Sequence, residues 1–146
     1  MTRDGFRSAA RRPFYPRLAA FAVSCLVGTL ATDLAYWLTA DIMWADFSDW
    51  LITVGVVAGY LTIVVALIEA FVVRSGRLRR RNWVWAIGLV VALILATLNM
   101  FVHMRDAWTS IVPWGVVLSA VVLAVVGISA WMTRETYDTA SAEVSA

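Results

Sequence analysis

Residues 50–73 read WLITVGVVAGYLTIVVALIEAFVV, a run of 24 residues in which Glu69 is the one charged side chain. A helix rises about 1.5 Å per residue, so this run reaches about 36 Å and exceeds the roughly 30 Å hydrocarbon core of a bilayer. Backbone groups in lipid must hydrogen-bond to one another, and a single apolar run does so as a helix. The stretch therefore predicts a transmembrane helix.

Three further stretches of the 146-residue chain have the same character. Residues 18–39 carry one charge, Asp33, residues 83–104 carry one ionisable group, His103, and residues 111–132 carry none. The chain is 62% hydrophobic and 15% charged, whereas soluble domains are about 45–50% apolar and about 25% charged. This composition excludes a soluble domain and a disordered chain, and the single cysteine excludes a disulfide scaffold.

We therefore predict an all-α integral membrane protein, a four-helix bundle with spans at 18–39, 50–73, 83–104 and 111–132. A basic tail (1–17) would precede the transmembrane domain (18–132), and a disordered polar tail (133–146) would follow it. The paired helices could form two hairpins related by an axis along the membrane normal, because both hairpins would start on the same side.

The arginines indicate the orientation of the chain. All twelve basic residues are arginine, and eleven of them lie in the two tails or in the connection between the second and third spans, whereas Arg105 lies on the other side. Cytoplasmic loops carry the excess of basic residues, so we expect both termini in the cytoplasm of a multi-pass inner-membrane protein. Arginines that flank spans also account for the net charge of +2 without nucleic-acid binding.

Small residues recur at helical spacing, and such stripes let helices approach closely in lipid. The packing candidates are Gly28, Gly55, Gly59, Gly88, Gly115 and Ser119. In the first span the predicted stripe runs through Ala20, Ser24, Gly28, Ala31 and Ala35. The last span offers a choice between the Gly115–Ser119 face and a face formed by Ala120, Ala124 and Gly127.

Three polar side chains fall in the same half of the predicted bundle, namely Asp33, Asn99 and His103. A charge at the bilayer centre costs about 2.5–3.5 kcal/mol on insertion scales, so such groups normally face the interior and pair. We expect a hydrogen bond between Asp33 and Asn99. His103 would be an interfacial residue at a helix end, or a metal or haem ligand, and Asp33 could instead relay protons.

Glu69 lies near the opposite end of the second span. Arginine side chains can extend to that depth, so we expect Glu69 to pair with Arg17, Arg74 or Arg77. The functional alternative for Glu69 is again a proton-relay carboxylate.

The sequence lacks the motifs of soluble enzymes, such as a glycine-rich phosphate loop, a nucleophile elbow, CxxC or HExxH. One histidine and one cysteine cannot supply the ligands of a metal site, and bis-histidine haem needs two histidines. We therefore predict no catalytic residue, no metal site and no cofactor.

Several stretches of the sequence resemble a known family. Residues 98–108 (LNMFVHMRDAW) and 67–71 (LIEAF), together with Pro16, Asp33, Gly55 and the pair Val112–Pro113, resemble the bacterial four-helix membrane proteins grouped as domain of unknown function 2231. The resemblance covers about Tyr15 to Trp131 and implies the same four-helix architecture, without an established activity. Many members place histidines where this chain has Tyr15 and Trp85, so a haem or metal role for those histidines does not carry over.

Three classes of function follow from these observations. The first is a non-enzymatic bundle in the lipid bilayer that acts as a scaffold or accessory subunit, with a second copy or a membrane complex as its partner. The second is a redox component that binds haem or quinone. The third is a small proton-coupled transporter or channel that uses Asp33 and Glu69.

Overall fold

The structure, a computed structural model, describes residues 14–73, 81–105 and 111–144. Within these ranges the chain forms helices α1 (Tyr15–Thr39), α2 (Ile42–Val73), α3 (Arg81–Arg105) and α4 (Val116–Val144), and a π-helical turn, η1 (Ile111–Gly115), leads into α4. Each of the four long helices is long and apolar enough to cross a membrane. The prediction of an all-α four-helix membrane bundle is confirmed.

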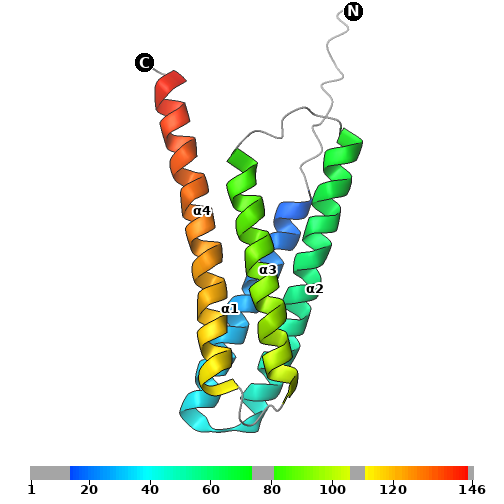
Figure 1. Cartoon of the computed structure of the whole chain (residues 1–146), viewed down its shortest axis with the longest axis vertical. Helices are drawn as coiled ribbons and strands as arrows, with labels where there is room; N and C mark the ends of the chain where they lie inside the picture. Colours follow the sequence, from blue (N-terminus) through cyan, green and yellow to red (C-terminus); the bar gives the residue numbers. More distant parts are fainter. Residues whose placement is uncertain (1–13, 74–80, 106–110, 145–146) are drawn as a thin grey trace, which may run out of the picture.

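The helices form two antiparallel pairs (Figure 1). The α1 helix packs along α2 and α3 packs along α4, and contacts between α1 and α4 and between α2 and α3 close the ring. Only Ala40 and Asp41 separate α1 from α2. Ala40 ends α1 in the left-handed conformation (φ 53°), and Asp41 Oδ1 accepts a hydrogen bond from Met43 N at 3.0 Å to begin α2. The end of the bundle that carries this connection is called the distal end below.

The second helix begins at Ile42 and not at Trp50, so segment 40–49, which the predicted spans left as a connection, is mostly helix. The candidate membrane span of α2, Ile42–Glu69, has 28 residues and is therefore about 42 Å long. That length matches a bilayer with its headgroups, about 40–45 Å, rather than the hydrocarbon core alone. The acidic first turns of α2 therefore fit the headgroup layer, which does not require an apolar sequence.

The fourth helix continues to Val144, so the prediction of a disordered tail from residue 133 is corrected for residues 133–144. The costly step in forming a helix is its first turn, so α4 can be extended past residue 132 without paying that cost again. These twelve residues also contain neither glycine nor proline, so nothing in their sequence ends the helix.

The interior is small and the outside is apolar. The buried core consists of Leu26, Ile52, Val56, Ala92, Ala96 and Val122. Large apolar side chains on every helix point outward, among them Phe21, Leu61, Ile94 and Ile128. This distribution fits a bundle surrounded by lipid, where helices associate through small residues and interhelical hydrogen bonds.

The structure decides which small-residue stripes face the interior. On α4 the Gly115–Ser119 face is buried, whereas the Ala120, Ala124 and Gly127 face is exposed. The stripe predicted for the first helix is wrong, because Ala20 and Ser24 are exposed. The buried face of α1 is instead formed by Ala19, Ala22, Cys25, Leu26, Thr29, Thr32 and Asp33.

Four of the predicted packing glycines lie where two helices approach closely. A Cβ atom on Gly59 (α2) would overlap Leu93 Cδ2 (α3), and one on Gly88 (α3) would lie 2.5 Å from Ser129 Cβ (α4). Between α1 and α2 the approaches are wider, because a Cβ atom on Gly55 would lie 3.1 Å from Cys25 Cβ and one on Gly28 would lie 3.1 Å from Leu51 Cδ1.

Replacing Gly59 with leucine should therefore lower the melting temperature of the purified protein. Overpacking of a close interface costs about 1–3 kcal/mol. Gly127→Leu is the matched control, because a Cβ at Gly127 meets nothing within 4 Å. Equal melting temperatures for Gly59→Leu and Gly127→Leu would show that the α2–α3 contact is not as close as described.

Candidate functional site

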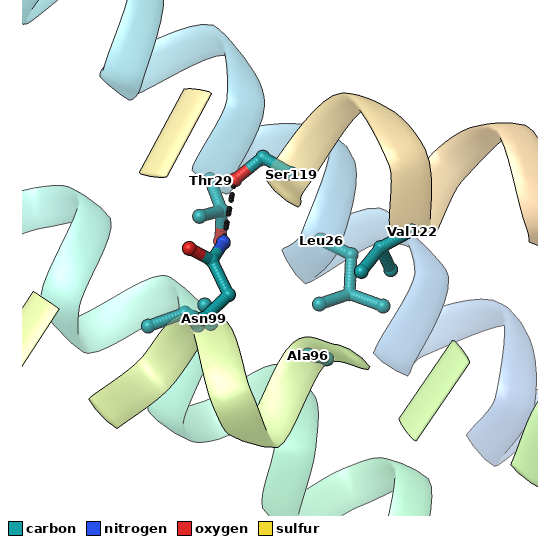
Figure 2. A pocket seen from close by; sticks show the side chains of 7 residues that line it. Leu26, Thr29, Ala96, Asn99, Ser119 and Val122 are labelled. Carbon is teal, nitrogen blue, oxygen red and sulfur yellow. Dashed lines mark hydrogen bonds between the residues drawn. The ribbon is translucent and has the colours of Figure 1, made fainter. Parts of the chain in front are cut away.

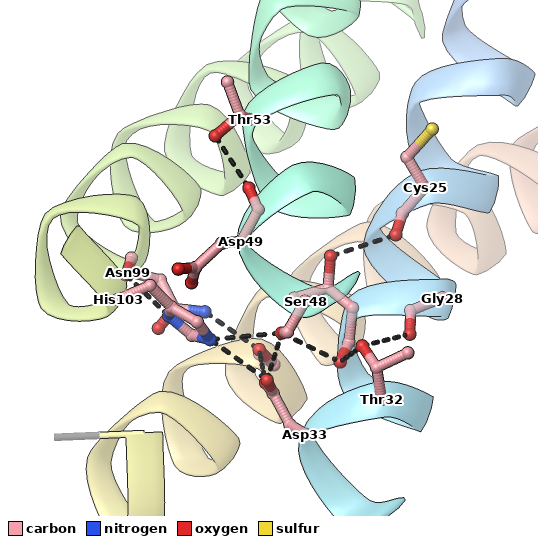
Figure 3. A network of polar contacts seen from close by, with 11 residues as sticks. Cys25, Gly28, Thr32, Asp33, Ser48, Asp49, Thr53, Asn99 and His103 are labelled. Atoms are coloured by element: carbon pink, nitrogen blue, oxygen red, sulfur yellow. Dashed lines mark hydrogen bonds and ion pairs between the residues drawn. The ribbon is translucent and has the colours of Figure 1, made fainter. Parts of the chain in front are cut away.

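The Asp33 carboxylate lies where the four helices meet (Figure 3). Asp33 comes from α1 and is 0% exposed. Its Oδ1 accepts hydrogen bonds from Ser48 Oγ of α2 and pairs with His103 Nε2 of α3 at 3.0 Å, and its Oδ2 accepts from Ser119 Oγ of α4 at 2.7 Å. All four residues lie within about two turns of the distal ends of their helices. One carboxylate thus joins every helix of the bundle.

Both ring nitrogens of His103 are occupied. Nδ1 lies 2.9 Å from the backbone oxygen of Asn99, and Nε2 lies 3.0 Å from Asp33 Oδ1 and 3.2 Å from Ser48 Oγ. A carbonyl oxygen only accepts, so Nδ1 carries a hydrogen and donates it. The ring is 1% exposed, and the backbone turn at Gly115 makes room for it, since a Cβ there would lie 2.9 Å from His103 Cε1.

The contact between His103 Nε2 and Asp33 Oδ1 requires one proton between the two atoms. The proton resides either on Nε2, giving an imidazolium beside a carboxylate, or on Asp33, giving a neutral ring beside a carboxylic acid. The pair is neutral overall in both forms. This neutrality explains how two ionisable groups can lie inside a membrane bundle, where an isolated charge is costly.

The predicted direct bond between Asp33 and Asn99 is bridged in the structure by Ser119. Asn99 Nδ2 donates to Ser119 Oγ at 2.8 Å, and Ser119 Oγ donates to Asp33 Oδ2. Asn99 Oδ1 is buried without a hydrogen-bond partner among the described residues. Asn99, Ser119 and Thr29 line one side of a small gap in the packing that leaves no space for a water molecule (Figure 2).

Sequence reasoning missed Ser48, which is 0% exposed and contacts both Asp33 and His103. The residue lies in segment 40–49, which the predicted spans leave as a connection between the first and second helices. The signal was present in the spacing, because the Gly55, Gly59 and Thr62 stripe continues backward through Ile52 to Ser48 in steps of three and four.

Glu69 lies apart from this network, near the other end of the bundle. Its Oε1 accepts a hydrogen bond from the backbone N–H of Phe14 at 2.8 Å, and so satisfies a free donor at the start of α1. In the described contacts Glu69 thus binds a backbone N–H group and not one of the predicted arginines. Arg17, one of those arginines, is exposed. Arg74 and Arg77 lie outside the described residues, so their pairing stays a prediction.

The described part of the chain contains no group of three or more His, Cys, Asp or Glu side chains that could hold a metal ion. An iron or zinc ion at His103 would need a free ring nitrogen, and Asn99 O and Asp33 occupy both. The arrangement is therefore suited to joining helices and to holding a proton, and a ligand at His103 would first have to break one of these bonds.

Comparison with known families agrees with this architecture. Residues 11–141 match the family of predicted membrane proteins designated DUF2231. The chain belongs to this family, as the resemblance noted above implied. No curated protein and no solved structure matches the chain.

The Asp33–His103 pair predicts unequal effects of two conservative substitutions on stability. His103→Gln leaves the buried Asp33 carboxyl group without the ring that shares its proton and should cost about 3–5 kcal/mol. Asp33→Asn should cost less than about 1 kcal/mol, because an amide can donate to a neutral His103 Nε2 and accept from Ser119.

This difference is tested by measuring the unfolding of the two single variants in detergent, together with that of the double variant Asp33→Asn/His103→Gln. The double variant should recover most of the loss caused by His103→Gln, and Asp46→Asn at an exposed position should change nothing. A loss for His103→Gln no larger than that for Asp33→Asn would mean that the two side chains are not paired.

Proposed function

We propose that the chain is a non-catalytic scaffold or accessory subunit of the cytoplasmic membrane, which acts as a homo-oligomer or within a membrane complex. One observation carries this proposal. The completely buried Asp33 carboxylate near the distal end is fully used in joining α1 to Ser48, His103 and Ser119 of the other three helices. Polar groups that bind one another in this way stabilise the arrangement of the helices and leave few hydrogen-bonding groups free to bind a substrate.

The interior also has little space for a ligand. The gap beside Asn99 leaves no space even for a water molecule, whereas sites for small molecules usually measure about 300–1,000 Å³. Apolar side chains, including Leu26, Ile52 and Val122, form most of its lining. This geometry favours a structural role over the binding of haem or quinone between the helices.

A proton pathway through one bundle is also disfavoured. Asp33 and Glu69 lie toward opposite ends, and the buried layer of Leu26, Ile52 and Val56 occupies the interior between them. Thr62, a buried polar side chain of α2 beyond this layer, bonds to its own helix at Ala58 O (2.8 Å) and provides no link.

The proposed orientation places both termini in the cytoplasm. The eleven-to-one distribution of arginines supports it. Exposed tryptophans near the distal end, Trp37, Trp50 and Trp114, fit the opposite headgroup layer, where aromatic side chains are enriched.

Extraction from native membranes in a mild detergent tests the proposal. The tagged chain should elute as an assembly heavier than one 16.1 kDa chain. Light scattering of the purified chain then separates self-association from a complex with another protein. The same preparation should show no Soret band, and proteoliposomes should show the same proton flux with wild type and with Asp33→Asn.

Three results would contradict the proposal. They are a single 16.1 kDa chain both in the extract and after purification, a Soret band that remains with the folded protein, and a proton flux that Asp33→Asn abolishes. The last two would favour the redox and the transport alternatives, respectively.

A further inference from the structure

We propose that Asp49 connects the buried Asp33–His103 pair to water at the distal end, so that the pair exchanges its proton with this side of the membrane through Asp49. The proposal goes beyond the scaffold role and does not depend on it. It assigns a proton-binding site that is open to one side only.

Asp49 has one oxygen inside the bundle and the rest of its side chain partly exposed. The residue follows Ser48 on α2, and its Oδ1 is buried without a hydrogen-bond partner among the described residues. Its backbone oxygen accepts a hydrogen bond from Thr53 Oγ1 at 2.7 Å. A buried carboxylate oxygen without a donor is a costly arrangement, and such groups call for an explanation.

The Asp49 side chain points toward the His103 ring (Figure 3). The two groups lie close enough to interact electrostatically, and Ser48, the neighbour of Asp49 in sequence, contacts Nε2 of the same ring at 3.2 Å. A partly exposed carboxylate that faces a buried imidazole can exchange a proton with it once the two groups come within hydrogen-bond reach or are joined by one water molecule.

Charged groups of three helices face one another here. Asp33 of α1 and Asp49 of α2 interact electrostatically with His103 of α3, and Asp46 of α2 interacts with Asp49. The stretch of α4 from residue 116 to residue 132 contains no titratable side chain and contributes Ser119 to the network. Asp46 is exposed and Asp49 is partly exposed, so Asp49 is the carboxylate placed between water and the ring.

Proton exchange can occur while each oxygen of the Asp33 carboxylate keeps a hydrogen-bond donor. When the ring turns from Asp33, Nε2–H gives its proton to the Asp49 carboxylate, which releases it to water, and the reverse steps restore it. Meanwhile Ser48 donates to Asp33 Oδ1 and Ser119 donates to Oδ2, so each carboxylate oxygen keeps a donor. No net charge or atom is gained over the cycle.

The opposite side of the pair is closed. Beyond Asn99 and Thr29 the interior is filled by the apolar layer that contains Leu26, Ile52 and Val122. The pair is therefore closed toward the middle of the bundle, and Asp49 is the partly exposed carboxylate on its distal side.

The test uses the single histidine of the chain, so that a ¹⁵N-histidine label reports on His103 alone. The rate at which the ring N–H hydrogens exchange with water is measured by NMR in lipid nanodiscs at one pH. Asp49→Asn keeps the shape but cannot carry a proton, and should slow this exchange at least about tenfold, since a positioned acid or base contributes about 10²–10⁴-fold to proton transfer. Asp49→Glu should restore exchange to within a few-fold of wild type.

Asp46→Asn, which removes an exposed aspartate one turn away, is the matched control and should leave the exchange unchanged. An unchanged rate in Asp49→Asn, or equal slowing in Asp46→Asn and Asp49→Asn, would overturn the proposal. The ring ¹⁵N chemical shifts of His103 show whether each variant is folded. If Asp49→Asn alters them, the exchange rates of Asp49→Glu and Asp49→Gln are compared instead, because these two side chains have the same length and only the first can carry a proton.

Discussion

A carboxylate that lies inside a membrane must obtain its hydrogen bonds from other helices, and the arrangement of this bundle depends on that requirement at Asp33. The three partners, Ser48, His103 and Ser119, each belong to a different helix. Water cannot replace them, because the residue is completely buried. The positions of α2, α3 and α4 around α1 are thus constrained by one side chain.

The same requirement sets the rotation of α1. A stripe of small residues can face either lipid or another helix at a similar free energy, because lipid tails are as apolar as leucine. Asp33 has no such choice. Turning Asp33 inward also turns Thr29 and Ala22 inward and leaves Ala20 and Ser24 exposed, which is what the structure shows. Buried ion pairs often add little to stability, and their better-supported role is to specify one arrangement among several.

The helices and the depth of their polar groups could be predicted from the sequence, because hydrophobic length and residue spacing are properties of a single segment. Depth along the axis placed Asp33, Asn99 and His103 in the same half of the bundle and matched Asp33 with Asn99, whereas His103 was expected nearer the interface. Depth could not show the rotation of each helix, so Ser119 was not expected between Asp33 and Asn99. Ser48 was missed because α2 continues through the headgroup layer, where an acidic sequence is compatible with a helix. The contact between Glu69 and the backbone of Phe14 carries no sequence signal, because any residue supplies an N–H group.

The central claim is that Asp33 and His103 are hydrogen-bonded inside the bilayer, and solid-state NMR of the protein in lipid tests it most directly. With ¹⁵N-histidine and ¹³C-aspartate labels, the dipolar coupling between His103 Nε2 and an aspartate carboxyl carbon should show direct hydrogen-bond contact, consistent with the 3.0 Å distance to Oδ1. This coupling should disappear in Asp33→Asn, which assigns it to Asp33 and not to Asp49. A coupling too weak for direct contact, or one that survives in Asp33→Asn, would contradict the account.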